Sequence, residues 1–335
     1  MTDVGQLLQG KVPGLNITAS GDPNKPAAVV MRGASTLNSS QGPFYVIDGV
    51  PGADISTIAP DDIATIDVLK DAAATAIYGN RAANGVIMVT TKKGKAGQMQ
   101  VSYSSFISAE KVSSRLNMMN ADQLTDFLKK TGVGLTDKDD LGASTDWQSA
   151  IQKSTAISTN HNLSVSGGGE HSNYSVSLNY VKKDGILLNS SLERVIGRLS
   201  VEQYALKDKL KLGFSVTNST SDAEDIPYRN TVLLQSTLYL PVSPILRSDG
   251  TYFENLQNNN YYNPVAMINN SQMNTKYSNL IGSFKAELKL PFGLTYNLNL
   301  SYLNSNSLSG SFYNSYFTTN YNNTLAKKRM ILYSC

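Results

Sequence analysis

Strict alternation of apolar and polar side chains marks much of the chain beyond residue 98. The period of two is clearest in residues 173–180, 209–216, 283–290 and 294–302. In the first of these segments, apolar residues from Tyr174 to Tyr180 alternate with Asn and Ser. Such a period gives a β-strand one apolar and one polar face. The pattern predicts antiparallel strands near residues 100–108, 158–166, 172–181, 194–203, 209–218, 278–290 and 293–304.

The connections between these predicted strands alternate between short and long. The short ones are residues 167–171, 204–208 and 291–293, and the long ones are residues 109–157, 182–193 and 219–277. Short turns at one rim and long loops at the other are typical of an outer-membrane β-barrel. The polar face, rich in Asn, Ser, Thr and Lys, and the many tyrosines on the apolar face favour the barrel. A β-sandwich also has period-two strands, so a non-transporting β-sandwich protein for binding or adhesion at the cell surface remains the alternative.

The first part of the chain follows a different pattern, in which short apolar runs are separated by Gly, Pro and Asp. It predicts a short helix over residues 4–9, a second helix over 72–78, and strands over 15–18, 27–32, 44–48, 63–69 and 86–91. Asp71 is a suitable N-cap for the second helix, and Gly79 is a suitable residue to end it. We therefore expect a small α+β domain over residues 1–97, followed by the strands of residues 98–335.

Composition excludes several classes of function. The chain has two histidines, His161 and His171, and one cysteine, Cys335, which is too few for a disulfide or a zinc site. We expect no catalytic residue, no metal and no cofactor, because neither a nucleophile with a base nor a supported carboxylate pair for glycan hydrolysis is present. The net charge is +3 with dispersed lysines, so we expect no nucleic-acid partner. No apolar run reaches the length of a spanning helix.

Several motifs follow one another in order within the first 95 residues. They are Arg32-Gly33, Tyr45-Val46-Ile47-Asp48-Gly49, Val68-Leu69-Lys70-Asp71, Ala76-Ile77-Tyr78-Gly79 and Arg81-Ala82-Ala83-Asn84-Gly85-Val86. Together they closely resemble the plug signature of the SusC/RagA-like TonB-dependent outer-membrane transporters. The residues that we expect to shape or gate the plug are Arg32, Gly33, Asp48, Gly49, Lys70, Asp71, Tyr78, Gly79, Arg81, Asn84 and Gly85.

Each of these residues also has a purely structural interpretation. The glycines fit positions of positive φ or close packing, and Asp71 fits a helix cap. Lys70 and Arg81 are either surface charges or partners of carboxylates on an inner barrel wall. For Tyr78 we favour a packed aromatic over a ligand contact.

The resemblance implies an active nutrient importer in the outer membrane of a Gram-negative bacterium, in contact with the lipids of that membrane. Family members take up oligosaccharides or peptides together with a SusD-like surface lipoprotein, and a periplasmic TonB protein remodels the plug. We expect the chain to depart from the family pattern in four ways. It shows no signal peptide, no N-terminal carboxypeptidase-regulatory-like domain and no recognisable TonB box, and it has about seven or eight strands where the family's barrel has twenty-two. We therefore expect an incomplete barrel, and a fragment that does not transport by itself.

The two longest loops carry further signals. Asn120 is a suitable cap for a helix over residues 121–130, which Gly132 would end. Trp147 has two interpretations, packing against this helix or contact with a substrate or partner. In the second loop, Tyr261 and Tyr262 lie in an Asn-rich segment and are candidates for a substrate or partner contact.

Overall fold

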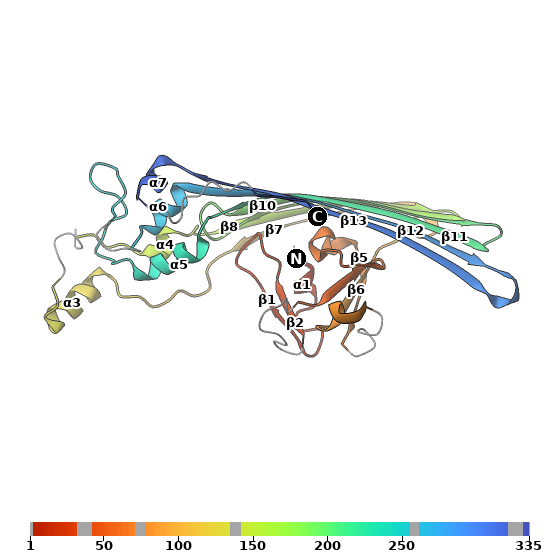
Figure 1. Cartoon of the computed structure of the whole chain (residues 1–335), viewed down its shortest axis with the longest axis horizontal. Coiled ribbons are helices and arrows are strands. Elements are labelled where there is room, and N and C mark those ends of the chain that lie inside the picture. The colour runs from red at the N-terminus through yellow and green to blue at the C-terminus, as the bar shows by residue number, and fades with distance from the viewer. Residues whose placement is uncertain are drawn as a thin grey trace.

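One long antiparallel sheet dominates the molecule, and a small N-terminal domain lies against one of its faces (Figure 1). The computed structural model describes residues 3–31, 42–70, 78–134, 142–254, 261–320 and 331–334. The sheet has eight strands in the order β14-β13-β12-β11-β10-β9-β8-β7, so every strand pairs with its neighbours in the sequence. Its strands are β7 (Gly97–Glu110), β8 (Ala156–Gly168), β9 (Ser172–Asp184), β10 (Ser191–Ala205), β11 (Leu210–Asp225), β12 (Ser271–Lys289), β13 (Thr295–Tyr313) and β14 (Ile331–Ser334).

All seven predicted strands are confirmed, and each is longer than predicted. The predicted long connection over residues 182–193 is wrong. Because β9 runs on to Asp184 and β10 begins at Ser191, only six residues join the two strands. The Nζ of Lys182 lies 2.8 Å from the Oε1 of Glu193 across these strands, within the segment that was predicted as loop. Short and long connections between consecutive strands therefore do not alternate strictly. The longest connections nevertheless lie at one end of the sheet (Figure 1).

The β-sandwich alternative does not hold. The strands β7–β14 form one sheet, and within the described residues no second sheet of comparable size packs on it face to face. In the part of the chain that the structure describes, the layer against its polar face is the small N-terminal domain (Figure 1). Among the residues that the structure describes, no helix is long and apolar enough to cross a membrane.

The N-terminal domain contains two small sheets. β1 pairs with β2 antiparallel, and a second sheet has the order β4-β3-β6-β5, in which β3 and β6 are parallel. Its elements are α1 (Val4–Leu7), β1 (Leu15–Thr18), β2 (Ala28–Met31), β3 (Phe44–Ile47), β4 (Val50–Pro51), β5 (Ile63–Leu69), β6 (Val86–Thr91) and the 3₁₀ turns η1 (Ile55–Thr57), η2 (Pro60–Asp62) and η3 (Gly79–Ala82). The five predicted strands are confirmed, and their buried side chains, such as Val29, Ile47 and Ile87, share one core. Arg32, Gly33, Asp71 and most of the predicted helix over 72–78 lie outside the described residues.

The longest connections carry helices at one end of the sheet (Figure 1). These are α3 (Ala121–Thr131), α4 (Trp147–Ala150), α5 (Arg229–Leu238), α6 (Pro264–Asn269) and α7 (Ser315–Asn320), and the opposite end has η4 (Pro291–Gly293) in a tight turn. The predicted helix after Asn120 is confirmed as α3. Asn120 and Gln123 form a capping box, and Gly132 ends the helix in the left-handed conformation.

Candidate functional site at the contact between domain and sheet

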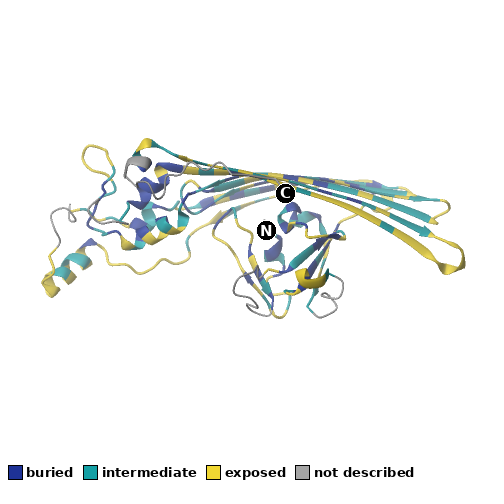
Figure 2. Ribbon diagram, in the orientation of Figure 1, coloured by how far each residue is buried: buried dark blue, intermediate teal, exposed yellow. Residues whose placement is uncertain are grey.

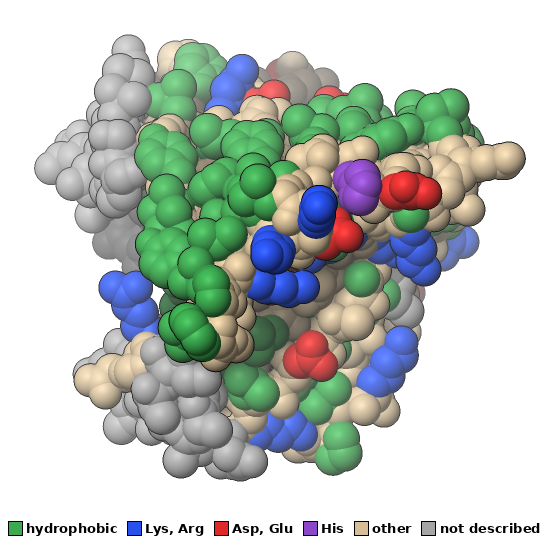
Figure 3. Space-filling model, turned by 90° about the vertical axis from the view of Figure 1, so that its right-hand side faces the viewer, with side chains coloured by type: hydrophobic (Ala, Val, Ile, Leu, Met, Phe, Trp, Pro, Cys, Tyr) green, Lys and Arg blue, Asp and Glu red, His purple; other side chains and the backbone are tan. Residues whose placement is uncertain are grey.

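The polar face of the central strands β8–β12 has many buried residues, and the N-terminal domain lies against this face (Figure 2). In β9, Ser175, Ser177 and Asn179 are buried, whereas Val176 and Leu178 on the opposite face are exposed. Other buried polar residues of the sheet are Ser158, Asn160, Asn162, Arg194, Arg198, Ser200, Thr217, Ser219, Thr275 and Ser283. Figure 3 shows hydrophobic side chains gathered over the sheet and Lys and Arg side chains near its junction with the domain. One face therefore suits an apolar surrounding, and the other suits a hydrated interior.

The turn between β3 and β4 forms the most densely connected part of the contact. Asp48 stands in this turn with a φ of 50°. Its Oδ1 accepts a hydrogen bond from the Thr91 backbone N at 2.9 Å, and its Oδ2 accepts one from the Thr91 Oγ1 at 2.6 Å. These bonds join the turn to the end of β6. From the sheet, Lys285 of β12 donates to the Asp48 carbonyl oxygen at 2.6 Å.

Arg198 of β10 reaches the same part of the domain. Its Nη1 donates to the Lys92 carbonyl oxygen at 3.0 Å, its Nη2 donates to the Thr91 Oγ1, and Nη2 lies 3.7 Å from the Asp48 Oδ2. The Arg198 side chain is only 2% exposed. A buried guanidinium is costly unless its charge is matched and its protons are accepted, so these contacts hold it in place.

A second group of charges lies beside this turn. The Nζ of Lys93 is 2.7 Å from the Glu202 Oε1, and the Nζ of Lys211 is 3.4 Å from the same oxygen. A cavity of about 260 Å³ lies between the domain and the sheet here, and Asp48, Arg198 and Glu202 are among its lining residues. The polar contact is therefore bordered by space large enough for several waters.

Two neighbouring carboxylates of η2 make a third contact. The Asp62 Oδ2 accepts a hydrogen bond from the Ser177 Oγ at 2.5 Å, and the Asp61 Oδ2 lies 3.3 Å from the Ser104 Oγ and from the Asn160 Nδ2. Burial raises the pKa of Asp62, although the bond from Ser177 and the charge of Arg198 oppose this effect. The domain thus contributes carboxylates and the sheet contributes hydroxyl, amide and guanidinium donors.

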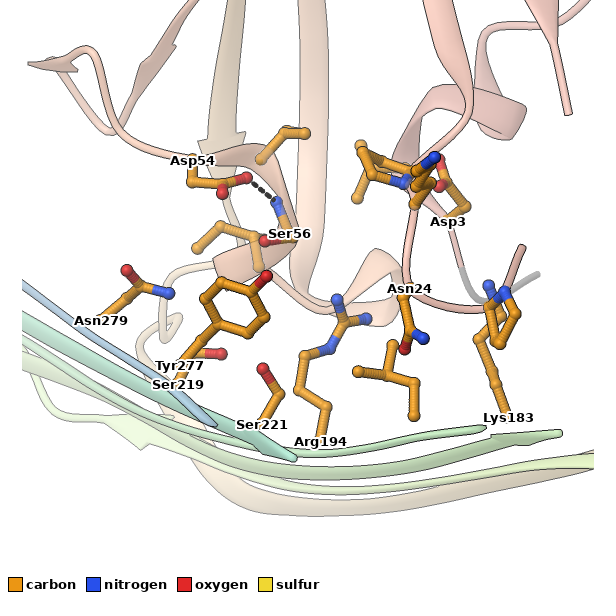
Figure 4. A pocket seen from close by; sticks show the side chains of 17 residues that line it. Asp3, Asn24, Asp54, Ser56, Lys183, Arg194, Ser219, Ser221, Tyr277 and Asn279 are labelled. Carbon is orange, nitrogen blue, oxygen red and sulfur yellow. Dashed lines mark hydrogen bonds between the residues drawn. The ribbon is translucent and has the colours of Figure 1, made fainter. Parts of the chain in front are cut away.

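A further cavity, of about 220 Å³, lies between α1, η1 and the sheet (Figure 4). Arg194 and Lys183 reach into it from the sheet, and Asp3 and Asp54 lie on the side of the domain. These two carboxylates, together with burial as the larger cause, raise the pKa of the nearby Tyr45 to about 12.

The predicted motif residues lie in two groups. Asp48 and Gly49 lie at the contact with the sheet, whereas the other predicted residues that the structure describes lie within the domain. Lys70 donates to the Pro13 carbonyl oxygen, and Tyr78 packs on Phe44 with ring centroids 5.9 Å apart. The other described members lie at or beside η3: Gly79 with a φ of 64°, the exposed Arg81, Asn84, and Gly85 with a φ of 85°. Within the described residues, neither Lys70 nor Arg81 forms an ion pair with a carboxylate of the sheet.

Trp147 lies at the helical end of the sheet and is 3% exposed. Its Nε1 donates to the Leu240 carbonyl oxygen at 2.9 Å, and its ring lies 4.6 Å from that of Tyr239. The packing interpretation fits, but the partner is not α3 as predicted; the surrounding side chains come from α4 to α7 and their loops. Tyr261 stacks on Tyr239 at 4.2 Å and, like Tyr262, is partly buried in this cluster. The burial of Trp147 argues against a ligand contact at its ring.

The motifs in the sequence do not identify the partners that the sheet contributes. Arg198 and Lys285 lie at polar positions of strands in which apolar and polar residues alternate. A charged residue on the face that another domain covers is a signal of a contact with that domain. Gly94, in the segment that joins β6 to β7, was also missed. A Cβ added there would lie 2.2 Å from the Tyr174 carbonyl oxygen and 2.7 Å from the Gly167 carbonyl oxygen. The chain therefore passes against the backbone of the β8–β9 hairpin, and no sequence pattern indicates this approach.

Comparison with known proteins identifies the N-terminal domain. Residues 1–86 match the sequence model of the family described as TonB-dependent Receptor Plug Domain. The N-terminal domain is the plug of a TonB-dependent receptor. Across 319 residues the chain is 32% identical to TonB-dependent receptor P3 of Formosa agariphila. The aligned region covers 92% of this chain and 31% of that protein. It is 37% identical over 225 residues to TonB-dependent receptor SusC of Bacteroides thetaiotaomicron, covering 64% of this chain and 22% of that protein.

The fold agrees with this assignment. A solved structure of the RagAB peptide importer superposes with a TM-score of 0.74 at 24% identity, covering 93% of this chain and 40% of that one. By the plug match and these sequence relatives, the chain is part of a TonB-dependent outer-membrane receptor of the SusC type, a protein of the Gram-negative outer membrane. Its relatives are receptors and transporters, which are not enzymes. The chain spans less than a third of the length of these two curated relatives.

Proposed function

We propose that this chain contributes the plug and part of the wall of an active importer of oligosaccharides or peptides. The observation that carries the proposal is the docking of the plug on the polar face of the sheet through mainly polar contacts. The polar face of the wall could line a path for a hydrophilic substrate. The plug lies against this face, so it would block the path at rest and open it by moving away. The names of two similar proteins, SusC and the RagAB peptide importer, support the same class of function.

The proposal includes an orientation in the membrane. We place the plug at residues 1–97 and the wall at residues 98–335, with the short turns in the periplasm. The loops over residues 109–157 and 219–277 then lie outside the cell, and the exposed apolar face, with Leu178 and Leu300, contacts lipid.

Two protein partners follow from this orientation. A SusD-like surface lipoprotein would cover the extracellular end, where α4 to α7 lie. A periplasmic TonB protein would supply the force that displaces the plug. An external source of force is needed because a tightly bound substrate must be released against its own binding free energy.

Growth of the native bacterium tests the proposal. Deletion of the gene that encodes this chain should abolish growth on at least one oligosaccharide or peptide as sole carbon source, and the intact gene should restore it. Deletion of tonB or addition of a protonophore should abolish uptake of the same compound by the complemented strain. Binding of the compound with unchanged uptake in the tonB strain would contradict active import. Unchanged growth on all oligosaccharides and peptides tested would contradict the substrate class.

A further inference from the structure

We propose that the Asp48-Gly49 turn is the latch that holds the plug on the wall, and that Arg198 and Lys285 position it. The idea that its opening precedes transport rests on the proposed function. The latch itself rests on the contacts below. Arg198 and Lys285 come from β10 and β12, so the turn is held by two separate strands of the wall.

The turn is suited to this role because it is fixed within the plug. The Asp48 backbone N donates to the Val89 carbonyl oxygen at 2.9 Å, in addition to the two bonds that its carboxylate accepts from Thr91. The turn therefore moves together with β6, and a contact with Asp48 holds the sheet of the plug rather than a loose loop.

Arg198 is the part of the latch that is hardest to replace. Its planar guanidinium contacts three acceptors of the plug at once, the Lys92 carbonyl, the Thr91 hydroxyl and the Asp48 carboxylate. A lysine would keep the charge but not this fork of donors. Because the side chain is almost fully buried, displacement of the plug removes acceptors from a charged group and requires water to replace them.

Lys285 explains the glycine after Asp48. Gly49 has a φ of 82°, and a Cβ on this residue would lie 3.1 Å from the Lys285 Nζ. The Nζ reaches the Asp48 carbonyl oxygen through this open space. The Asp-Gly pair thus provides both the carboxylate for Thr91 and the free access for Lys285. The adjoining cavity of about 260 Å³ provides room for water when the latch opens.

A thiol beneath the plug tests the latch without substrate and without TonB. Ser200 is 7% exposed and lines the same cavity, so Ser200→Cys in a Cys335→Ser background reports when the plug leaves the wall. We would measure its rate of labelling by a hydrophilic maleimide in isolated outer membranes. Loss of hydrogen bonds to a buried charge predicts labelling roughly 10- to 100-fold faster in Arg198→Met. Lys285→Met should also be faster, and Arg198→Lys should be intermediate.

Two controls separate a latch from general loss of structure. Lys276→Met removes another lysine of β12, which pairs with Asp222 of the wall and with no plug residue among those described, and should leave the rate unchanged. Ala82→Cys places the thiol in the core of the plug, where the residue is 1% exposed, and its labelling should stay slow in Arg198→Met. Equal acceleration at both thiols, or an unchanged Ser200→Cys rate in Arg198→Met, would overturn the proposal. Because no substrate is present, either result is independent of the growth experiment.

Discussion

Gly94→Ala should disturb the passage from the plug to the first strand of the wall. The added Cβ would stand 2.2 Å from the Tyr174 carbonyl oxygen, whereas real Cβ atoms essentially never approach closer than 3.0 Å, so about 0.8 Å of separation is missing. The opposing atoms belong to the backbone of the β8–β9 hairpin, which cannot rotate away as a side chain could. Either the hairpin or the segment after β6 must therefore shift.

The expected cost is that of overpacking, about 1–3 kcal/mol. For a protein of this size that corresponds to a fall in melting temperature of about 2–10 °C. The shift should also displace the neighbouring residue Lys93 and so weaken its ion pair with Glu202. The melting temperature of the protein in detergent, followed by circular dichroism, measures the effect.

Gly169→Ala is the matched control, because Gly169 lies in the turn of the same hairpin and has no atom within 4 Å of an added Cβ. Its melting temperature should stay within about 2 °C of the parent protein, since surface substitutions change stability by about 0.5 kcal/mol or less. If the two variants melted at the same temperature, the close approach of Gly94 to the hairpin would be refuted.

Three further predictions concern the plug core, a buried charge and the outer face. Ile87→Ala, at a position that is 0% exposed, should cost about 2–5 kcal/mol in thermal melts, and Ile87→Val only about 0.5–1.5. Because burial raises the pKa of Asp62, its contribution to stability is fully present below the ordinary pKa of 3.8 and is lost as the pH rises through the higher folded pKa. Asp62→Asn should remove this loss in melts recorded from pH 3.8 upwards. Leu178→Arg should destabilise the protein in bilayers by about 2–4 kcal/mol if this face meets lipid, and Glu170→Arg in the adjacent turn by about 0–1; equal effects in chemical denaturation would count against a lipid-facing β9.

The regular parts of this fold could be predicted from the sequence because each follows from a local rule. Side chains that alternate along β9 place Val176 and Leu178 on one face and Ser177 on the other. Asn120 and Gly132 define α3 through capping alone. The ends of strands were less predictable, since β9 and β10 continue through polar residues that pair across the strands.

The partners across the contact could not be predicted in the same way. Asp48 was selected by its motif, but nothing local specifies that Arg198 and Lys285 would meet it. These contacts depend on the register of the strands in the sheet and on the position in which the plug docks. Trp147 shows the same limit, because its packing partner comes from a loop about 90 residues further along the chain.

The sequential order of the strands has a consequence for how the molecule is built. Each hairpin of the wall joins segments that are neighbours in the chain, so its ends meet at a small loss of chain entropy. The bond between Lys285 and Asp48 instead closes a loop of 237 residues. Pairing of β10, β11 and β12 must come first, because only then do the two cations stand close enough to receive the turn. We therefore expect docking of the plug to be a late event in folding, after the part of the wall that receives it.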